Sequence, residues 1–357
     1  MGRNVSSQPL RVAIVGAGRI GRRRAEVMAA SRSARVVLVA DTDRARAAAL
    51  AAACGGRVTE SWEAAATAEA VDVVVVTTSH DGLARATRAA LEAGKDVFCE
   101  KPLARNLAEA APLVALAERR GRVLAVGFNH RCHPGLARLR ALATEGAIGQ
   151  LLWARCRYGH GGRAGYEREW RADPVRAGGG ELLDQGIHAL DLFGWLFGEF
   201  AEVAAFLQTA FWPVAVEDNA FVLLRTAAGQ VASLHASWTQ WRNLFSFELC
   251  GSQGYLCVEG LGGNYGPERL RVGKRAENFG APDEQVIEFP GEDRSWELEW
   301  CAFVSAVRGQ GTPVASGRDA LAALRLVEAA YRAAAVGSVI RPERDPAAAP
   351  VAAEAVG

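Results

Sequence analysis

A glycine-rich turn near the start of the chain limits the folds that the sequence can adopt. Residues 16–21 read Gly-Ala-Gly-Arg-Ile-Gly, between a short apolar stretch at 11–15 and a stretch of helical composition at 20–30. In this spacing the first glycine forms a tight turn, the second lets the backbone approach a ligand, and the third lets helix and strand pack closely. The free N–H groups at a helix N-terminus favour a bound phosphate. The sequence therefore predicts a strand–turn–helix unit that binds a pyrophosphate through Gly16, Gly18, Arg19, Ile20 and Gly21.

An aspartate ends the next predicted strand, residues 36–40. Asp41 follows Gly21 by about 20 residues, where a carboxylate accepts hydrogen bonds from the adenosine ribose of a dinucleotide. Because a carboxylate repels a 2′-phosphate, NAD is favoured over NADP, although Arg44 and Arg46 follow closely and leave NADP open. The alternative is a glycine turn in an α/β domain that binds no cofactor.

Strands and helices alternate over the first third of the chain. Such a series is typical of a doubly wound parallel sheet. We expect a loose N-terminus at residues 1–9 and an NAD(P)-binding Rossmann domain at 10–128. The further strands are predicted at 71–77, 96–99 and 123–128, and the helices at 45–53, 83–93 and 107–120.

The pattern changes after residue 128. Several strands are expected between 201 and 289 without helices between them, which favours an antiparallel sheet. We expect a C-terminal domain for substrate binding and oligomerisation at residues 129–340, and a disordered Ala/Pro-rich tail at 341–357. The remaining predicted elements of this part are a strand at 151–158 and helices at 136–145, 181–197, 295–308 and 317–335.

The composition excludes several classes of protein. Lys+Arg number 41 and Asp+Glu 40, and this balance argues against a nucleic-acid partner. No apolar run reaches the roughly 20 residues of a membrane span, and the N-terminus lacks the apolar core of a signal peptide. We therefore expect no membrane association and a cytoplasmic location. The seven cysteines form no C-x-x-C pair, which indicates reduced thiols, and no metal site is expected.

A lysine follows the predicted strand at 96–99, in the sequence Glu100-Lys101-Pro102. The carboxyl end of a parallel strand borders the ligand crevice of an open sheet, and Pro102 stiffens the turn. Position alone leaves two interpretations open, a residue of the functional site and a surface lysine beside a helix start.

Three polar side chains recur along the predicted helix at 181–197. Asp184, His188 and Asp191 are spaced i, i+4 and i+7, which places them on one face of a helix that is otherwise apolar. Such a stripe either serves a site or forms a buried His–Asp network that orients the fold.

Together these features resemble the Gfo/Idh/MocA oxidoreductases, which include glucose–fructose oxidoreductase and inositol dehydrogenases. The resemblance implies a Rossmann domain, a C-terminal α/β domain with an open, mostly antiparallel sheet, and a homodimer or homotetramer. It also implies oxidation or reduction of a sugar or cyclitol carbinol with a nicotinamide cofactor, with Asp184 and His188 in the places of the catalytic Asp and His. The matching segments are 16–21, Asp41, 93–95, 100–102, 127–128, 178–180, Asp184 and His188.

The implied chemistry needs these residue types. When hydride leaves a carbinol carbon, its hydroxyl must lose a proton, and a base with a pKa near neutral does this best. His188 is the natural base, with Lys101 stabilising the developing alkoxide; Lys101 is itself the base if burial lowers its pKa. We expect Asp184 to hold His188 or a substrate hydroxyl, and Asp191 to be structural and to orient His188.

One segment departs from the family pattern. Many members carry Thr-Pro-Asn and then a His after the central strand, whereas this chain has His80 near the place of the Asn and Leu83 in place of the His. We expect this loop to line the cofactor side. Thr77, Thr78, His80, Glu100 and Lys101 therefore join the predicted cofactor residues.

Two later segments are expected to face the substrate, residues 129–131 and the Gly/Arg/aromatic loop at 158–171. Aromatic faces stack on sugar C–H surfaces, and arginine pairs with carboxylate or phosphate. The sequence therefore suggests a polyhydroxylated or anionic substrate, namely a sugar, a cyclitol or a nucleotide-linked sugar. The predicted substrate residues are Asn129, His130, Arg131, Tyr158, His160, Arg163 and Trp170.

Two other functions stay open from the sequence. One is a glycoside hydrolase of the same superfamily that uses NAD for transient oxidation before elimination. The other is a cofactor-binding regulator without catalysis. The combination of Lys101, Asp184 and His188 argues against the regulator, because a binding protein has no need of acid and base groups.

Overall fold

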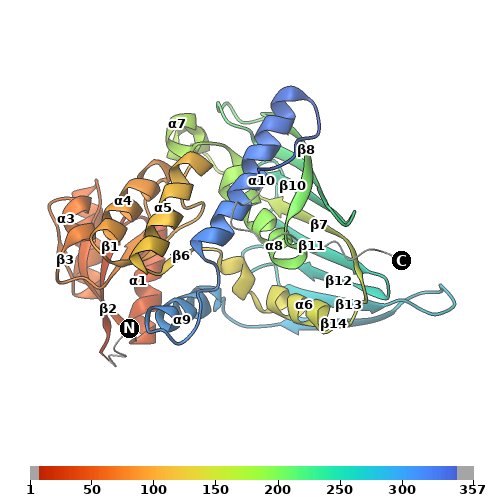
Figure 1. Ribbon diagram of the computed structural model, residues 1–357, viewed down its shortest axis with the longest axis horizontal. Coiled ribbons are helices and arrows are strands. Elements are labelled where there is room, and N and C mark those ends of the chain that lie inside the picture. Colours follow the sequence, from red (N-terminus) through yellow and green to blue (C-terminus); the bar gives the residue numbers. More distant parts are fainter. Residues whose placement is uncertain (1–7, 344–357) are drawn as a thin grey trace.

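The computed structural model describes residues 8–343, and within this range the chain forms two β-sheets flanked by helices (Figure 1). The predicted loose end at 1–9 and disordered tail at 341–357 fall mainly on residues outside the described range. The division into domains at residues 128 and 129 stays a prediction, although the two sheets divide the chain in the same region.

The first sheet, within the described range, has six parallel strands in the order β3-β2-β1-β4-β5-β6. The centre is β4, whose four consecutive valines are all fully buried. Hydrophobic clusters place α1, α2 and α9 on one face of the sheet and α3, α4 and α5 on the other. The strands are β1 (Leu10–Val15), β2 (Ala34–Ala40), β3 (Arg57–Val58), β4 (Val73–Val76), β5 (Asp96–Cys99) and β6 (Leu124–Val126), and the helices are α1 (Arg19–Ser31), α2 (Arg44–Cys54), α3 (Trp62–Thr67), α4 (His80–Glu92), α5 (Leu107–Arg120) and α9 (Ser295–Val307).

The second sheet, counted over the described residues 8–343, has eight strands in the order β14-β13-β12-β11-β7-β10-β9-β8. Its pairings are antiparallel except for β7 with β10, so the expected α/β fold with a Rossmann sheet and a mostly antiparallel second sheet is confirmed. The strands are β7 (Leu151–Gly159), β8 (Phe200–Gln208), β9 (Asn219–Thr226), β10 (Val231–Ser237), β11 (Leu244–Gly251), β12 (Gly254–Glu259), β13 (Glu268–Lys274) and β14 (Asp283–Phe289).

Helices cover one face of the second sheet (Figure 1). These helices are α6 (Pro134–Thr144), α8 (Ile187–Phe197) and α10 (Gly317–Val336). The opposite face exposes apolar side chains that alternate with buried ones along β8 and β9, among them Phe206, Phe221 and Leu223. None of the helices in residues 8–343 is long and apolar enough to cross a membrane.

The last helices return to the Rossmann sheet. Helix α9 packs against α1, and an isolated bridge joins Ala125 of β6 to Ser316 just before α10. Helix α9 and the start of α10 therefore contact the Rossmann sheet and α1, the helix that follows the glycine turn. This contact brings residues near 295 close to the carboxyl ends of the parallel strands.

The structure adds local features that the sequence pattern did not predict. Strand β3 and helix α3 were absent from the expected elements, and α4 begins at His80 rather than at residue 83. The helix expected at 181–197 begins instead with a π-helical turn, Leu182–Gly186, followed by α8. Turns of this kind are frequent at functional sites.

Candidate active site

A cavity of about 920 Å³ lies at the carboxyl ends of β1, β2 and β4. This is the crevice in which a doubly wound sheet binds its ligand. The predicted residues Gly16, Gly18, Arg19, Ile20, Asp41, Thr77 and Thr78 line it. We call this cavity the cofactor cleft.

The three glycines of the turn meet different surroundings. Gly16 has φ +105°, and a Cβ there would lie 2.6 Å from the Thr77 carbonyl oxygen. A Cβ on Gly21 would lie 2.0 Å from the Gly16 oxygen, whereas one on Gly18 would meet nothing within 4 Å. Within the described residues, no side chain caps α1 and its first turn holds no acidic residue. This open, uncapped N-terminus fits a pyrophosphate.

Asp41 joins the glycine turn to the end of β2. One carboxylate oxygen accepts from the backbone N–H of Ala17 at 2.6 Å, and the other from that of Asp43 at 2.7 Å. Arg44 and Arg46 line the same end of the cleft. The acidic group that disfavours a 2′-phosphate therefore lies beside cations that would attract one.

A second cavity of about 250 Å³ adjoins the cofactor cleft. The two share Arg19, Ile20, Arg163 and Arg171 in their lining, so a ligand in one can reach a ligand in the other. We call this second cavity the substrate cavity. Of the predicted residues, it is lined by Glu100, Lys101, Asn129, His130, Tyr158, His160, Arg163, Asp184 and His188.

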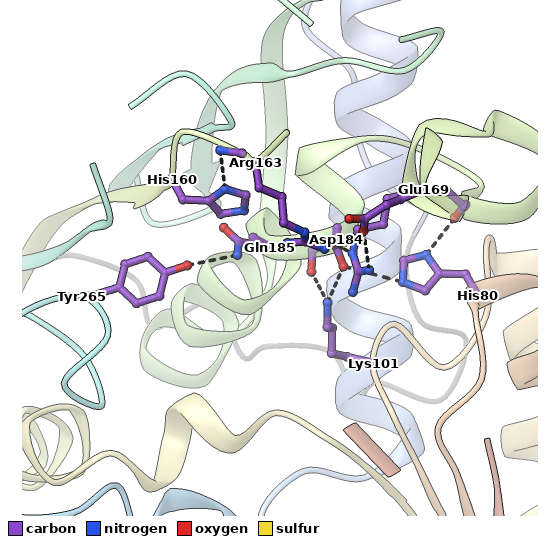
Figure 2. A network of polar contacts seen from close by, with 11 residues as sticks. His80, Lys101, His160, Arg163, Glu169, Asp184, Gln185 and Tyr265 are labelled. Atoms are coloured by element: carbon purple, nitrogen blue, oxygen red, sulfur yellow. Dashed lines mark hydrogen bonds and ion pairs between the residues drawn. The ribbon is translucent and has the colours of Figure 1, made fainter. Parts of the chain in front are cut away.

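Lys101 connects the Rossmann sheet to the π-helical turn. It follows β5, and its ammonium group donates to the backbone oxygen of Asp184 and, at 2.7 Å, to the carboxylate oxygen Oδ1 (Figure 2). The lysine side chain is only 17% exposed. Lys101 lines the substrate cavity, which adjoins the cofactor cleft, and its place among the cofactor residues stays a prediction.

Asp184 is a buried carboxylate surrounded by nitrogen atoms. Besides Lys101, Arg171 donates from Nε at 2.8 Å, and Nε2 of His80 lies 3.8 Å away. Burial alone would raise the pKa of Asp184, but the charges of Lys101 and Arg171 hold this pKa well below its usual value. Asp184 is therefore an anion that orients Lys101, and the expected hydrogen bond to His188 is not formed.

His188 lies in the same cavity with a different kind of support. Its ring stacks on His130 at 3.9 Å between centroids and meets the edge of Phe128. Among the described residues, its Nδ1 atom has no hydrogen-bond partner. Burial, together with the charge of Lys101, lowers the pKa of His188 well below 6.5, so the ring is neutral and is a weaker base than a free histidine.

Asp191 does not orient His188, which corrects the sequence prediction. Its carboxylate binds Arg131 through two hydrogen bonds, at 2.6 and 2.8 Å. Arg131 also contacts Asp319 and lies outside the lining of the substrate cavity. We therefore remove Arg131 from the substrate residues, because its guanidinium is committed to two carboxylates within the protein.

Three other predicted residues lie elsewhere than expected. His80 is buried outside the lining of the cofactor cleft, and its Nδ1 donates to the Ala177 carbonyl at 2.8 Å. Burial lowers the pKa of His80 to about 4. Trp170 lines the cofactor cleft instead of the substrate cavity. Glu100 faces the substrate cavity, but its carboxylate forms an ion pair with Arg24 at 2.7 Å.

The site also contains residues that the sequence did not identify. Arg24 is almost completely buried between the rings of Phe98 and Trp296, and it joins Glu100 to Glu299 of α9. These three charged residues come from positions so far apart in the chain that no local motif reveals their contact. Arg171, Gln185 and Tyr265 also line the substrate cavity without having been assigned a role.

Comparisons with known proteins agree with this architecture. Residues 10–128 match the model of an oxidoreductase family with an NAD-binding Rossmann fold, and residues 136–257 match the GFO/IDH/MocA C-terminal domain. The chain is 29% identical to inositol 2-dehydrogenase of Rhizobium meliloti, over 91% of this chain and 97% of that protein. It is 30% identical to D-apiose dehydrogenase of Paraburkholderia graminis, over 92% and 88%. The structure of a levoglucosan dehydrogenase in complex with NADH superposes with a TM-score of 0.86 at 25% identity, covering 95% of this chain and all of that one.

Proposed function

This chain belongs to the Gfo/Idh/MocA family of oxidoreductases, and we propose that it transfers a hydride between a nicotinamide cofactor and a CH–OH or ketone carbon of a neutral sugar or cyclitol. The observation that carries this proposal is the substrate cavity. There Lys101, Asp184 and His188 meet directly beside the cofactor cleft.

The Rossmann half has an NAD-binding fold, and the residues of the cofactor cleft fit the dinucleotide. The N-terminus of α1 would hold the pyrophosphate, and Asp41 the adenosine ribose. When bound, the nicotinamide ring supplies the acceptor or donor of the hydride. The residues of the protein bind and orient the substrate and move one proton.

His188 takes the hydroxyl proton in the oxidation direction. Because its pKa lies well below 6.5, the ring is neutral at physiological pH and has a free lone pair. Lys101, held by the ionised Asp184, is suited to donate a hydrogen bond to the oxygen that becomes negative. Asp184 is a positioning residue here, since its oxygens are already occupied by Lys101 and Arg171.

The pairing of two arginines of the cavity with carboxylates favours a neutral substrate over a nucleotide-linked one. Arg171 is paired with Asp184, and Arg163 with Glu169 at 2.6 Å. Arg163, which the sequence predicted as a substrate residue, and Arg171 are thus used within the protein. The relatives support the same substrate class, because they are named for inositol, apiose and levoglucosan.

The appearance of NADH absorbance tests this proposal. Purified protein and NAD would be incubated with neutral sugars and inositols, and in parallel with uronic acids and nucleotide-linked sugars. We expect NADH with a neutral polyol. NADH only with the anionic compounds would overturn the neutral substrate class. Absence of NADH from every oxidation, and of its consumption with the matching ketones, would overturn the proposal and favour the NAD-dependent hydrolase or the regulator.

We also propose that the exposed apolar face of the second sheet joins two copies of this chain. Phe206 is 80% exposed and Leu223 55%, on adjacent strands of that face. Sedimentation velocity would show a dimer or tetramer for the wild type, and smaller particles for the double variant Phe206→Lys, Leu223→Lys. A monomeric wild type would contradict this proposal.

A further inference from the structure

We propose that Gln185, Tyr265 and His160 form a polar wall that binds a second hydroxyl group of the substrate, beside the carbinol that reacts. This inference rests on the proposed function and deepens it, because it assigns specificity to residues outside the Lys101–Asp184–His188 set. All three residues line the substrate cavity.

Gln185 has one used and one unused side-chain atom. Its Nε2 donates to the Tyr265 hydroxyl at 3.1 Å (Figure 2). Its Oε1 is shielded from solvent and has no donor among the described residues. A shielded acceptor without a donor is unfavourable, so it is expected to find a partner when a ligand binds.

The two neighbours of Gln185 supply donors. His160 accepts the backbone N–H of Gly162 on Nδ1 at 2.8 Å, which places its proton on Nε2. Burial lowers the pKa of His160, which keeps this neutral form. The Tyr265 oxygen accepts from Gln185, so its own hydrogen can be donated elsewhere. Figure 2 shows His160 and Tyr265 on either side of the Gln185 amide.

The wall therefore offers an acceptor between two donors. A hydroxyl group donates one hydrogen bond and accepts others, so it can give its hydrogen to Gln185 and accept from His160 or Tyr265. A methylene group at the same place would leave these atoms unpaired. Sites built in this way discriminate strongly against analogues that lack the hydroxyl.

The position of Gln185 supports a role in substrate recognition. It lies in the π-helical turn between Asp184 and His188, three residues before the proposed base. Gln185 and His188 both line the substrate cavity. The second hydroxyl would thus bind within the same small cavity as the reacting carbinol, whereas His160 and Tyr265 reach the wall from segments about 25 residues before and 80 residues after Gln185.

Gln185→Leu tests this inference with matched substrates. The polyols would be D-glucose and myo-inositol, each compared with its monodeoxy derivatives, and the readout is kcat/KM from NADH formation. For the wild type we expect one deoxy position to lower kcat/KM by about 100-fold or more. Gln185→Leu should lower kcat/KM for the parent polyol by a similar factor and leave that one deoxy derivative nearly unaffected. Tyr265→Phe should show the same pattern with a smaller amplitude.

Gln310→Leu, at an exposed position, is the matched control and should keep the wild-type pattern. If Gln185→Leu lowered kcat/KM equally for the parent and for all deoxy forms, Gln185 would only stabilise the π-helical turn, and the inference would be wrong. The same conclusion would follow if the wild type did not distinguish any deoxy form. If the wild type oxidised neither these polyols nor any other on the panel, the proposed function itself would fail, and this inference with it.

Discussion

The cofactor cleft and the substrate cavity adjoin each other but are built in different ways. The cleft is built around the backbone of the glycine turn and the ends of three neighbouring strands. The cavity is formed by side chains from distant segments, including Lys101, His130, Asp184 and Tyr265, of which the first and last lie 164 residues apart. A backbone site is sensitive to added volume, whereas a side-chain site is sensitive to lost charge and lost hydrogen bonds.

The cleft and the cavity also differ in the groups that hold their carboxylates. In the cleft, the carboxylate of Asp41 is fixed by two backbone N–H groups. In the cavity, the carboxylate of Asp184 is fixed by the side chains of Lys101 and Arg171. Substitutions in the cleft should therefore change cofactor affinity, and substitutions in the cavity should change the rate.

Replacement of His188 should have the largest of these effects. His188→Gln removes the proposed base, so kcat should fall by roughly 10²- to 10⁴-fold while the Kd for NADH stays nearly constant. His235→Gln, on the second sheet, is the control. Because the pKa of His188 is lowered, the wild-type rate should hold from neutral pH down to values well below 6.5. An acid limb centred near 6.5, or a His188→Gln variant at full rate, would contradict the assignment.

His80 tests whether a buried group close to Asp184 contributes to stability. Its pKa is lowered from 6.5 to about 4, so the unfolded chain binds this proton more readily than the folded one. Stability is then complete above pH 6.5 and decreases as the pH falls toward 4, by about 3 kcal/mol in total from this residue. His80→Gln should lose that part of the pH dependence in urea unfolding. If the free energy of unfolding of the two proteins changed with pH in parallel, His80 would not be the source of this pH dependence.

Gly18 tests the backbone character of the cleft. A Cβ at this position meets no atom of residues 8–343 within 4 Å, so Gly18→Ala should fold with wild-type stability. The same methyl group would fill space needed by the pyrophosphate, and the Kd for NADH should rise about 10- to 100-fold. Gly194→Ala, also with open space in α8, is the control. Unchanged NADH affinity in Gly18→Ala would place the pyrophosphate elsewhere.

Asp41 should give the smallest effect, on the choice of cofactor. Asp41→Asn removes the charge that repels a 2′-phosphate and leaves Arg44 and Arg46 in place. The ratio of the Kd values for NADPH and NADH should shift about tenfold toward NADPH. Fluorescence titration with both reduced cofactors measures this ratio. A ratio unchanged from the wild type would show that Asp41 does not set the preference.

The sequence predicted the cofactor cleft better than the cavity, for a physical reason. The glycine turn and Asp41 are close in sequence and follow the strand–helix alternation, so their spacing carries most of the geometry. Their positions agree with the prediction. The i, i+4, i+7 argument for the helix failed in part, because the π-helical turn and the arginines changed the partners. Asp184 bound Lys101 and Arg171 instead of His188, and Asp191 bound Arg131.

Contacts between distant residues were the part that no local pattern could reveal. Arg24 is one of four arginines in α1, and nothing in its local sequence marks it as the one that is buried between Glu100 and Glu299. His80 was expected at the cofactor because of its place near a family motif, and the structure adds a bond from its buried ring to the Ala177 carbonyl that the motif did not reveal. Such pairings depend on how the second half of the chain returns to the first sheet.

The most direct test of the account compares NADH formation by wild type, Lys101→Met and Lys274→Met. The substrate is the polyol that the wild type oxidises fastest, and the Kd for NADH is measured on the same preparations. We predict that Lys101→Met loses roughly 10²- to 10³-fold in kcat with its NADH affinity almost unchanged, and that the exposed Lys274→Met resembles the wild type. A Lys101→Met protein that turns over at the wild-type rate would contradict the account.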